Sequence, residues 1–387
     1  PQGGTPDVRI VAGGCIGSSI DCRVREYDLQ RKTTYYSNNN VTEILRSLYP
    51  YIKPLSIEGK SAYRGLSILI KSGAWNTKSI KQLAKAVMRV NVLNQIGKSD
   101  FIHSHIFTSV YDYLFVAKAY NVPIIVTFHG LPTRGGVQIN NQRINNIIFK
   151  EVKIFLVNTK YAKRQLMSLG CPENKIEIIP QGIKVDDYPY VPKMMIKNRR
   201  TILLTVARLA YEKGHEYAIE AVKQLKESGY DVEYRIVGDG PLKDSIKSLI
   251  GVHKLEENIK LLGEIEREEL KQQYRDAHIF ILPSIEDVKG MHTETQGVVI
   301  QEAQASGKIV IAAKTGGIPE CVDDGTSAFL VEPRNSKILA EKIRWIIENQ
   351  DKWSKWQVAG RKWVEENYSL EKVGERICDV YRTMMHR

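Results

Sequence analysis

Several signatures of common protein classes are missing from this 387-residue chain. No apolar run reaches the roughly 18–20 residues that cross a bilayer, so no membrane-spanning helix is expected. The start is not that of a signal peptide, although the chain begins with Pro1 rather than Met, which is compatible with missing upstream residues. The 5 cysteines are scattered and form no Cys-x-x-Cys pair, so the sequence predicts neither a disulfide framework nor a zinc site and favours the reducing cytoplasm. They are Cys15, Cys22, Cys171, Cys321 and Cys378.

Motifs of several enzyme classes are also absent. The chain has no Asp-x-Asp pair, and therefore no candidate for the metal-bridged diphosphate site of one large glycosyltransferase class. It has no G-x-S-x-G elbow, no G-x-x-x-x-G-K-[ST] loop and no H-E-x-x-H helix. The sequence thus predicts no metal site and no nucleophile elbow.

Positive charge is present in excess but is unevenly distributed. The formal net charge is +12, from 56 Lys and Arg against 44 Asp and Glu. Residues 1–184 hold 25 basic and 11 acidic residues, whereas the remainder holds 31 and 33. A basic surface attracts nucleic acid, an anionic membrane or a phosphate-bearing substrate, and the sign of the charge alone does not choose among them.

Short, β-branched apolar runs alternate with amphipathic segments along most of the chain. Runs such as Thr201–Val206 and Ile279–Leu282 are typical of strands buried on both faces. This alternation predicts an α/β fold with parallel sheets. The stretch Pro180–Lys197 has four Pro and Gly residues and no helical period, which indicates a boundary. We therefore expect a first domain at 1–184, a linker at 185–197, a second domain at 198–368 and a C-terminal amphipathic helix within 369–387.

Two acidic residues give the strongest site signal in the second half. Glu294 follows a predicted strand and Glu302 lies about one turn inside the next predicted helix, so both are expected near the carboxyl edge of the sheet. Carboxylates there can accept hydrogen bonds from vicinal sugar hydroxyls. Gly297 and Val298, at the start of that helix, would present backbone amides to a phosphate. Taken alone, the two carboxylates could equally be solvent-facing surface residues.

Two further turns in the second half carry candidate ligands. Arg208 follows the strand Thr201–Val206 and Lys213 precedes a helix, a suitable clamp for a diphosphate, although either could be a solvated surface cation. Gly238 and Asp239 follow another predicted strand. The sequence is equally compatible with close approach of their backbone to a donor and with a plain turn. Pro241 is predicted to be the first residue of the helix that follows.

The first half contributes histidines and glycines to the candidate list. His129 ends a predicted strand directly before Gly130, and His103 and His105 end the neighbouring one. Each could face a substrate hydroxyl, but a single histidine is more often structural. Gly13 and Gly14 follow the strand Val8–Ala12 as in a phosphate-binding turn, yet no amphipathic helix follows them.

In combination, these elements resemble the retaining GT-B glycosyltransferases of family 4. The likeness runs from about Asp100 to the C-terminus, and its densest strings are TVARLAYEKG at 205–214, RIVGDGPL at 235–242 and ETQGVVIQE at 294–302. The resemblance implies two Rossmann-like domains facing a central cleft, with the acceptor on the first domain and a nucleotide diphosphate sugar on the second. It also implies that the C-terminal helix crosses back to the first domain, and that no metal or other cofactor is required.

The resemblance assigns roles to individual residues. Arg208 and Lys213 match the pair that holds the donor diphosphate, Glu302 the carboxylate on the ribose, and Glu294 the one on the transferred sugar. His129 matches the histidine beside the sugar at the reacting centre. Two departures stand out: Thr295 replaces the glycine that usually follows the first glutamate, and Gly13 and Gly14 are all that remains of the N-terminal glycine-rich loop.

The implied activity is sugar transfer with retention, in the synthesis of a surface polysaccharide or glycolipid. The basic amphipathic stretch Asn76–Lys98 could rest on the inner face of the cell membrane, where a cytoplasmic protein would meet a lipid-linked acceptor. Alternatively, it is an ordinary domain helix with a solvated cationic face. A GT-B phosphorylase or a sugar-nucleotide epimerase would share the fold. A nucleic-acid-binding protein and a nicotinamide-dependent oxidoreductase are disfavoured, because their motifs are missing.

Overall fold

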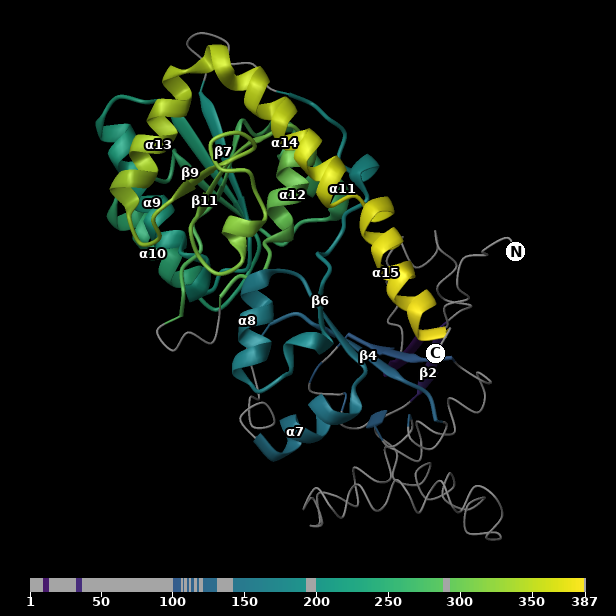
Figure 1. Cartoon of the computed structure of the whole chain (residues 1–387). Coiled ribbons are helices and arrows are strands. Elements are labelled where there is room, and N and C mark those ends of the chain that lie inside the picture. The colour runs from purple at the N-terminus through teal and green to yellow at the C-terminus, as the bar shows by residue number, and fades with distance from the viewer. Residues whose placement is uncertain are drawn as a thin grey trace.

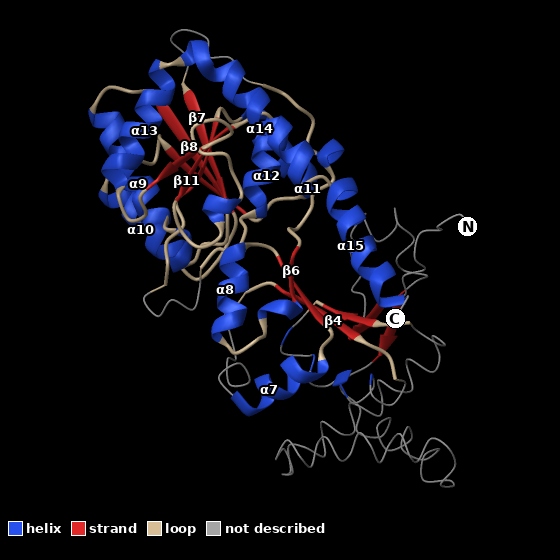
Figure 2. Ribbon diagram, viewed as in Figure 1, coloured by secondary structure: helices blue, strands red, loops and turns tan. Residues whose placement is uncertain are grey.

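The computed structural model describes residues 10–13, 33–36, 100–105, 121–130, 142–192, 200–287 and 293–385, together with Phe107, Val110, Tyr113, Leu114 and Ala117. Two α/β units are visible, one built on residues from 200 onward and one on the residues before 192 (Figure 1). Both units are layered, with parallel strands inside and helices outside (Figure 2). The α/β class and the GT-B arrangement of two parallel-sheet domains, both predicted from sequence, are confirmed.

The second domain contains one six-stranded parallel sheet in the order β12-β11-β10-β7-β8-β9. Its strands are β7 (Thr201–Val206), β8 (Val232–Val237), β9 (Ile259–Gly263), β10 (Ile279–Leu282), β11 (Ile309–Ala313) and β12 (Phe329–Val331). Every residue of β10 and β11 is buried, as their continuous apolar sequences predict. The strand order reverses between β7 and β10, which is the place where parallel sheets of this kind bind ligands.

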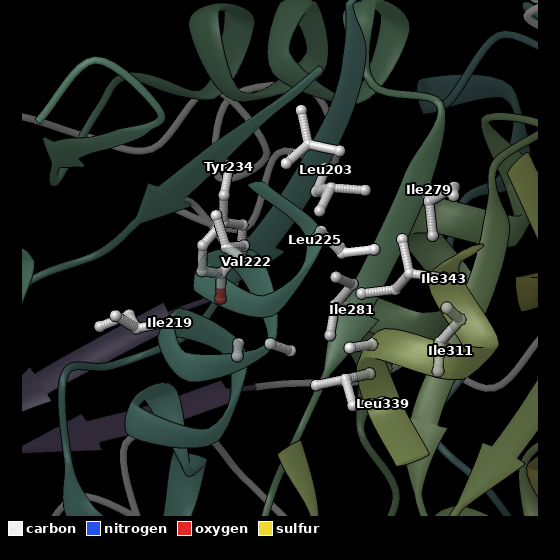
Figure 3. Close-up of a cluster of buried hydrophobic side chains, with 14 of the residues drawn as sticks. Leu203, Ile219, Val222, Leu225, Tyr234, Ile279, Ile281, Ile311, Leu339 and Ile343 are labelled. Carbon is white, nitrogen blue, oxygen red and sulfur yellow. The ribbon is translucent and has the colours of Figure 1, made fainter. Parts of the chain in front are cut away.

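Helices cover both faces of this sheet. They are α9 (His215–Glu227), α10 (Lys243–Val252), α11 (Arg267–Asp276), α12 (Val298–Ala305), α13 (Ser336–Glu348) and α14 (Trp353–Asn367). In α13, Leu339, Ile343 and Ile346 repeat at helical spacing and are buried, and the Asn335 side chain caps the helix by accepting from Ile338 N at 3.0 Å. Figure 3 shows the resulting core between α9, α13 and the strands.

The first domain contains a four-stranded parallel sheet in the order β3-β4-β5-β6. Its strands are β3 (Ile102–Ser104), β4 (Ile124–Phe128), β5 (Ile154–Val157) and β6 (Ile176–Ile178), and its helices include α7 (Gln142–Glu151) and α8 (Lys160–Ser168). A separate parallel pair is formed by β1 (Ile10–Gly13) and β2 (Thr33–Tyr36). In the core of the four-stranded sheet, the aromatic ring of Phe107 packs against those of Phe128 and Phe155.

The C-terminal helix α15 (Leu370–Met385) leaves the second domain and lies along the first (Figure 1). Val373 and Met384 are buried against Ile125 of β4 and Leu156 of β5. Ile377, Val380 and Tyr381 extend the same face, which matches the apolar stripe in the sequence. The chain therefore crosses between the domains twice, at residues near 183 and at Ser369, where Ile183 and Ser369 form a β-bridge.

Some sequence predictions of the elements were wrong in detail. Pro241 was predicted to begin a helix, but it lies in a turn and α10 begins at Lys243. The strand predicted to end at His103 and His105 is β3, which begins at Ile102 and ends at Ser104. No element was predicted between Gly14 and Asn40, yet this segment contains β2, which pairs with β1.

Candidate functional site

A cleft of about 500 Å³ opens at the switch point of the second sheet. The carboxyl ends of β7 and β10 supply Val206 and Leu282 to its wall, and the loops after these strands supply most of the remainder. The first domain closes the opposite side with His129, Asn158 and Gln181. The cleft therefore lies between the carboxyl edges of two parallel sheets, a usual place for a ligand in such folds.

Three charged groups predicted from sequence meet in this cleft. Lys213 and Glu294 form an ion pair through the Lys213 Nζ and the Glu294 Oε2, and Arg208 Nη2 donates to Glu212 Oε1 at 2.6 Å. Arg208 and Lys213 come from the β7 loop, whereas Glu294 comes from the β10 loop. Two cations and the carboxylates of Glu212 and Glu294 thus line one wall, which offers both donors for an anionic group and acceptors for hydroxyl groups of a ligand.

Gly297 forms the floor beside these charges. It takes a φ of 76°, in the left-handed region, and caps the N-terminus of α12, whose first residues Val298 and Val299 also line the cleft. Glycine adopts this backbone conformation without steric penalty. The N-terminal end of α12, with Gly297 and Val298, therefore faces the cleft.

The Gly238–Asp239 turn, for which the sequence left donor contact and a plain turn both open, packs against the β7 loop. Neither residue is among the described residues that line the cleft. A Cβ on Gly238 would lie 2.1 Å from the carbonyl oxygen of Ala207, so the turn packs directly under the Arg208 loop, and Leu209 N donates to Asp239 O at 2.9 Å. Hydrogen bonds from Lys243 and Gly240 N lower the pKa of Asp239. These residues support the loop that carries Arg208.

Glu302 lies one turn inside α12, as predicted, but the structure gives its carboxylate two protein partners. Tyr188 and Tyr274 each donate a phenolic hydrogen bond to it, both at 2.8 Å. Burial and the charge of Glu302 raise the pKa of both tyrosines, so both remain protonated donors. Glu302 is not among the described residues that line the cleft.

Three strands of the first domain are each followed by a polar residue that lines the cleft. His129 follows β4, Asn158 follows β5 and Gln181 follows β6 by three residues. The Gln181 amide nitrogen lies 2.7 Å from His129 Nδ1. Burial, and then the neighbouring His105, lower the pKa of His129, so its ring is neutral near pH 7. His129 was predicted from sequence, whereas Asn158 and Gln181 were not.

His103 and His105 lie at the end of β3, and the ring of His105 is next to that of His129. The His103 and His105 rings lie 4.3 Å apart between centroids, and the His105 and His129 rings stack at 6.0 Å. His103 faces inward: its Nδ1 contacts Tyr381 Oη at 2.6 Å and its Nε2 contacts Thr127 Oγ1 at 2.8 Å. His103 thus joins α15 to the sheet, whereas the exposed His105 lies beside His129.

The burial of His103 should make the fold sensitive to acid. Burial, then the charges of His105 and His129, lower the pKa of His103 from 6.5 to about 3. The unfolded chain binds this proton near pH 6.5 and the folded protein only near pH 3, so stability is lost as the pH falls through this window. We expect the melting temperature to fall between pH 7 and pH 5 less steeply in His103→Gln than in the wild type. Parallel curves would contradict this expectation.

Thr295, which departs from the family pattern, contacts the first domain. Its hydroxyl donates to His129 O at 3.2 Å and accepts from Asn158 Nδ2 at 3.1 Å, and its carbonyl accepts from Thr159 Oγ1 at 2.8 Å. A Cβ on Gly130 would lie 2.6 Å from the Thr295 methyl group. The side chain at 295 therefore fills the space that Gly130 leaves and joins the two edges of the cleft.

The remaining predicted positions belong to the N-terminal glycines and the basic stretch. Gly13 ends β1, and Gly14 falls outside the described residues, as do Lys78, Lys81, Lys85 and Arg89 of the basic stretch. Among the residues that the structure describes, no group of three or more His, Cys, Asp or Glu is placed to hold a metal ion. None of the described helices combines the length and apolar character that crossing a bilayer requires.

Comparisons with known proteins relate the chain to glycosyltransferases. Residues 190–363 match the family model of the glycosyl transferases group 1, and residues 57–187 match that of glycosyltransferase family 4. The solved structure of Anabaena HepE in complex with UDP and glucose superposes with a TM-score of 0.69, at 17% identity, over 92% of this chain and 88% of that one. At this identity the likeness concerns the fold.

Two curated relatives share more of the sequence. The amylovoran biosynthesis glycosyltransferase AmsK of Erwinia amylovora is 27% identical over 314 residues, which cover 80% of this chain and 75% of AmsK. WcaL of Escherichia coli, ascribed to colanic acid biosynthesis as a glycosyltransferase, is 28% identical over 265 residues, or 67% of this chain. The chain spans 64% of the length of WcaL.

Proposed function

Because the chain belongs to the glycosyl transferases group 1 family, we propose that it transfers a sugar from a nucleotide diphosphate sugar to an acceptor hydroxyl. The observation that carries this proposal is the placement of Arg208, Lys213 and Glu294 on one wall of the cleft, opposite His129. The relatives named for amylovoran and colanic acid biosynthesis support an acceptor in the assembly of a surface polysaccharide or glycolipid.

The two cations would stabilise the negative charge that develops when the bond between the sugar and the diphosphate breaks. When the bond between the sugar and the diphosphate lengthens, negative charge accumulates on the leaving phosphate, and Arg208 and Lys213 are placed to stabilise it. Glu294 would bind hydroxyls of the sugar, because a carboxylate accepts two such bonds. The departing phosphate can take the acceptor proton on the same face, which gives retention and requires only positioning from the protein.

We further propose that transfer requires no divalent metal, since the two cations already supply positive charge beside the diphosphate. UDP-, GDP- and ADP-sugars should be screened by thermal shift with and without EDTA. One of them should raise the melting temperature of the full chain, since a ligand of the folded state stabilises it, and EDTA should not remove the shift. A shift abolished by EDTA would contradict metal independence, and no shift from any of these donors would contradict the proposed donor class.

The excess of positive charge in residues 1–184 supports a location on the anionic inner face of the cell membrane, where lipid-linked acceptors occur. We expect the protein to co-sediment with vesicles that contain acidic phospholipids and to dissociate as salt is raised, because charge attraction is screened. Vesicles of neutral phospholipid are the control. Equal binding to both, or none to the acidic vesicles, would contradict a membrane location set by charge.

A further inference from the structure

Gln181 links the loop of Glu294 to His129. Its backbone is held on both sides by the Gln296 side chain, with Gln181 N donating to Gln296 Oε1 at 2.7 Å and Gln296 Nε2 donating to Gln181 O at 2.8 Å. Gln296 is 2% exposed and lies two residues after Glu294. The β10 loop of the second domain therefore fixes the position of a first-domain residue at the cleft.

The side chain of Gln181 then determines which nitrogen of His129 carries the proton. The amide nitrogen of Gln181 is a donor, so His129 Nδ1, at 2.7 Å, must accept. A neutral imidazole has one donor and one acceptor nitrogen, and Nε2 is therefore protonated. Burial and His105 lower the pKa of His129, which keeps the ring in this neutral form.

We infer that Gln181 is a positioning residue that holds His129 in the tautomer with its proton on Nε2, so that His129 donates a hydrogen bond to an oxygen of the sugar and cannot serve as a base. This inference rests on the proposed sugar transfer. The donor hydrogen bond is useful in the transition state if the oxygen gains negative charge or must be held in place. With its proton on Nε2, His129 recognises a hydrogen-bond acceptor on the ligand and does not remove a proton from it.

Gln181→Glu tests the inference because it keeps the shape but reverses the hydrogen bond. The carboxylate accepts from Nδ1, so the neutral ring of the variant carries no proton on Nε2, and the added negative charge raises the pKa of His129. The backbone bonds to Gln296 do not involve the substituted atoms, so folding should be preserved. Besides the new carboxylate, the groups around His129 are His105, with His103 behind it, and the cleft residues Arg208, Glu212, Lys213 and Glu294.

Activity of Gln181→Glu should depend on pH in a characteristic way. At low pH the doubly protonated ring still donates from Nε2, and turnover should approach that of the wild type. As the pH rises through the raised pKa, Nε2 loses its proton, and turnover should fall about tenfold relative to the wild type, the scale of one lost hydrogen bond. Gln272→Glu, a matched substitution on the exposed face of α11, should follow the wild-type profile. A loss in Gln181→Glu that does not vary with pH would overturn the inference.

A second measurement does not depend on activity. Nitrogen-15 spectra of the full chain, with the His129 signals assigned by their loss in His129→Gln, should show Nε2 protonated in the wild type and Nδ1 protonated in Gln181→Glu. Protonated Nδ1 in the wild type would overturn the inference even if the protein transfers sugar. Conversely, the expected spectra in a protein that transfers no sugar would contradict the proposed function and leave the tautomer assignment intact.

Discussion

Lys213→Ala should lower kcat/KM for the nucleotide sugar at least about 100-fold, the scale of removing one charge-stabilising donor from a transition state. Lys213 reaches the cleft from the β7 loop and pairs with Glu294, so its ammonium lies beside the group expected to bind the sugar. Loss of the cation leaves the developing charge on the diphosphate to Arg208 alone. Steady-state kinetics with the donor identified by thermal shift measure the effect.

The fold should survive this substitution. Lys213 and Glu294 are both partly exposed, with side-chain exposures of 19% and 20%, and partly solvated ion pairs contribute little to stability. Lys362→Ala removes an exposed lysine from an ion pair with Glu366 on α14 and should leave both kcat/KM and the melting temperature unchanged. Near-normal turnover of purified Lys213→Ala would refute the assignment of this lysine.

Glu302→Ala should lower the free energy of unfolding by about 2–6 kcal/mol, because two phenols lose their acceptor at a cost of roughly 1–3 kcal/mol each. Tyr274 is fully buried and the half-buried Tyr188 packs against it edge to face, so the Tyr274 hydroxyl cannot readily turn to water. Glu302 is predicted by the family resemblance to bind the donor ribose. Its alanine variant therefore combines a loss of stability with any loss of donor binding.

A mutant cycle separates the two effects. In a Tyr188→Phe/Tyr274→Phe background no phenol needs an acceptor, so Glu302→Ala should cost far less stability than it costs in the wild type. Urea unfolding of the four proteins gives the coupling free energy, and thermal shift with the donor gives binding. A coupling near zero would show that the tyrosines do not depend on Glu302. Full donor binding by the triple variant would remove the predicted ribose contact.

Local sequence patterns accounted for most of the elements but not for all of their limits. The buried strands β7, β10 and β11 were predictable because continuous β-branched runs fit strands covered on both faces. The strand β2 was not predicted, because Thr33–Tyr36 has no continuous apolar run, although Thr and Tyr both favour strands. Likewise, Pro241 is compatible both with the first turn of a helix and with the non-helical turn in which it lies, so the start of α10 could not be predicted from it.

The candidate site was predictable where its residues end strands of the second domain. Arg208, Lys213 and Glu294 follow β7 and β10, and parallel strands bring such residues to one edge. The orientation of Glu302 was not predictable, because spacing places it on α12 but does not say which neighbour the helix packs against. Only the contacts with Tyr188 and Tyr274 show that its carboxylate is already engaged.

By itself, the sequence determined the fold class, the absence of the common metal and nucleophile motifs, and the division of charge between the two halves. All of these depend on composition or on neighbours within a few residues. The tertiary structure alone decided that Gln181 contacts His129, that Thr295 joins the domains, and that the half-buried His103 contacts Tyr381 of α15. These pairs are between 52 and 278 residues apart, and such distances are set by strand order and domain packing, which no local pattern specifies.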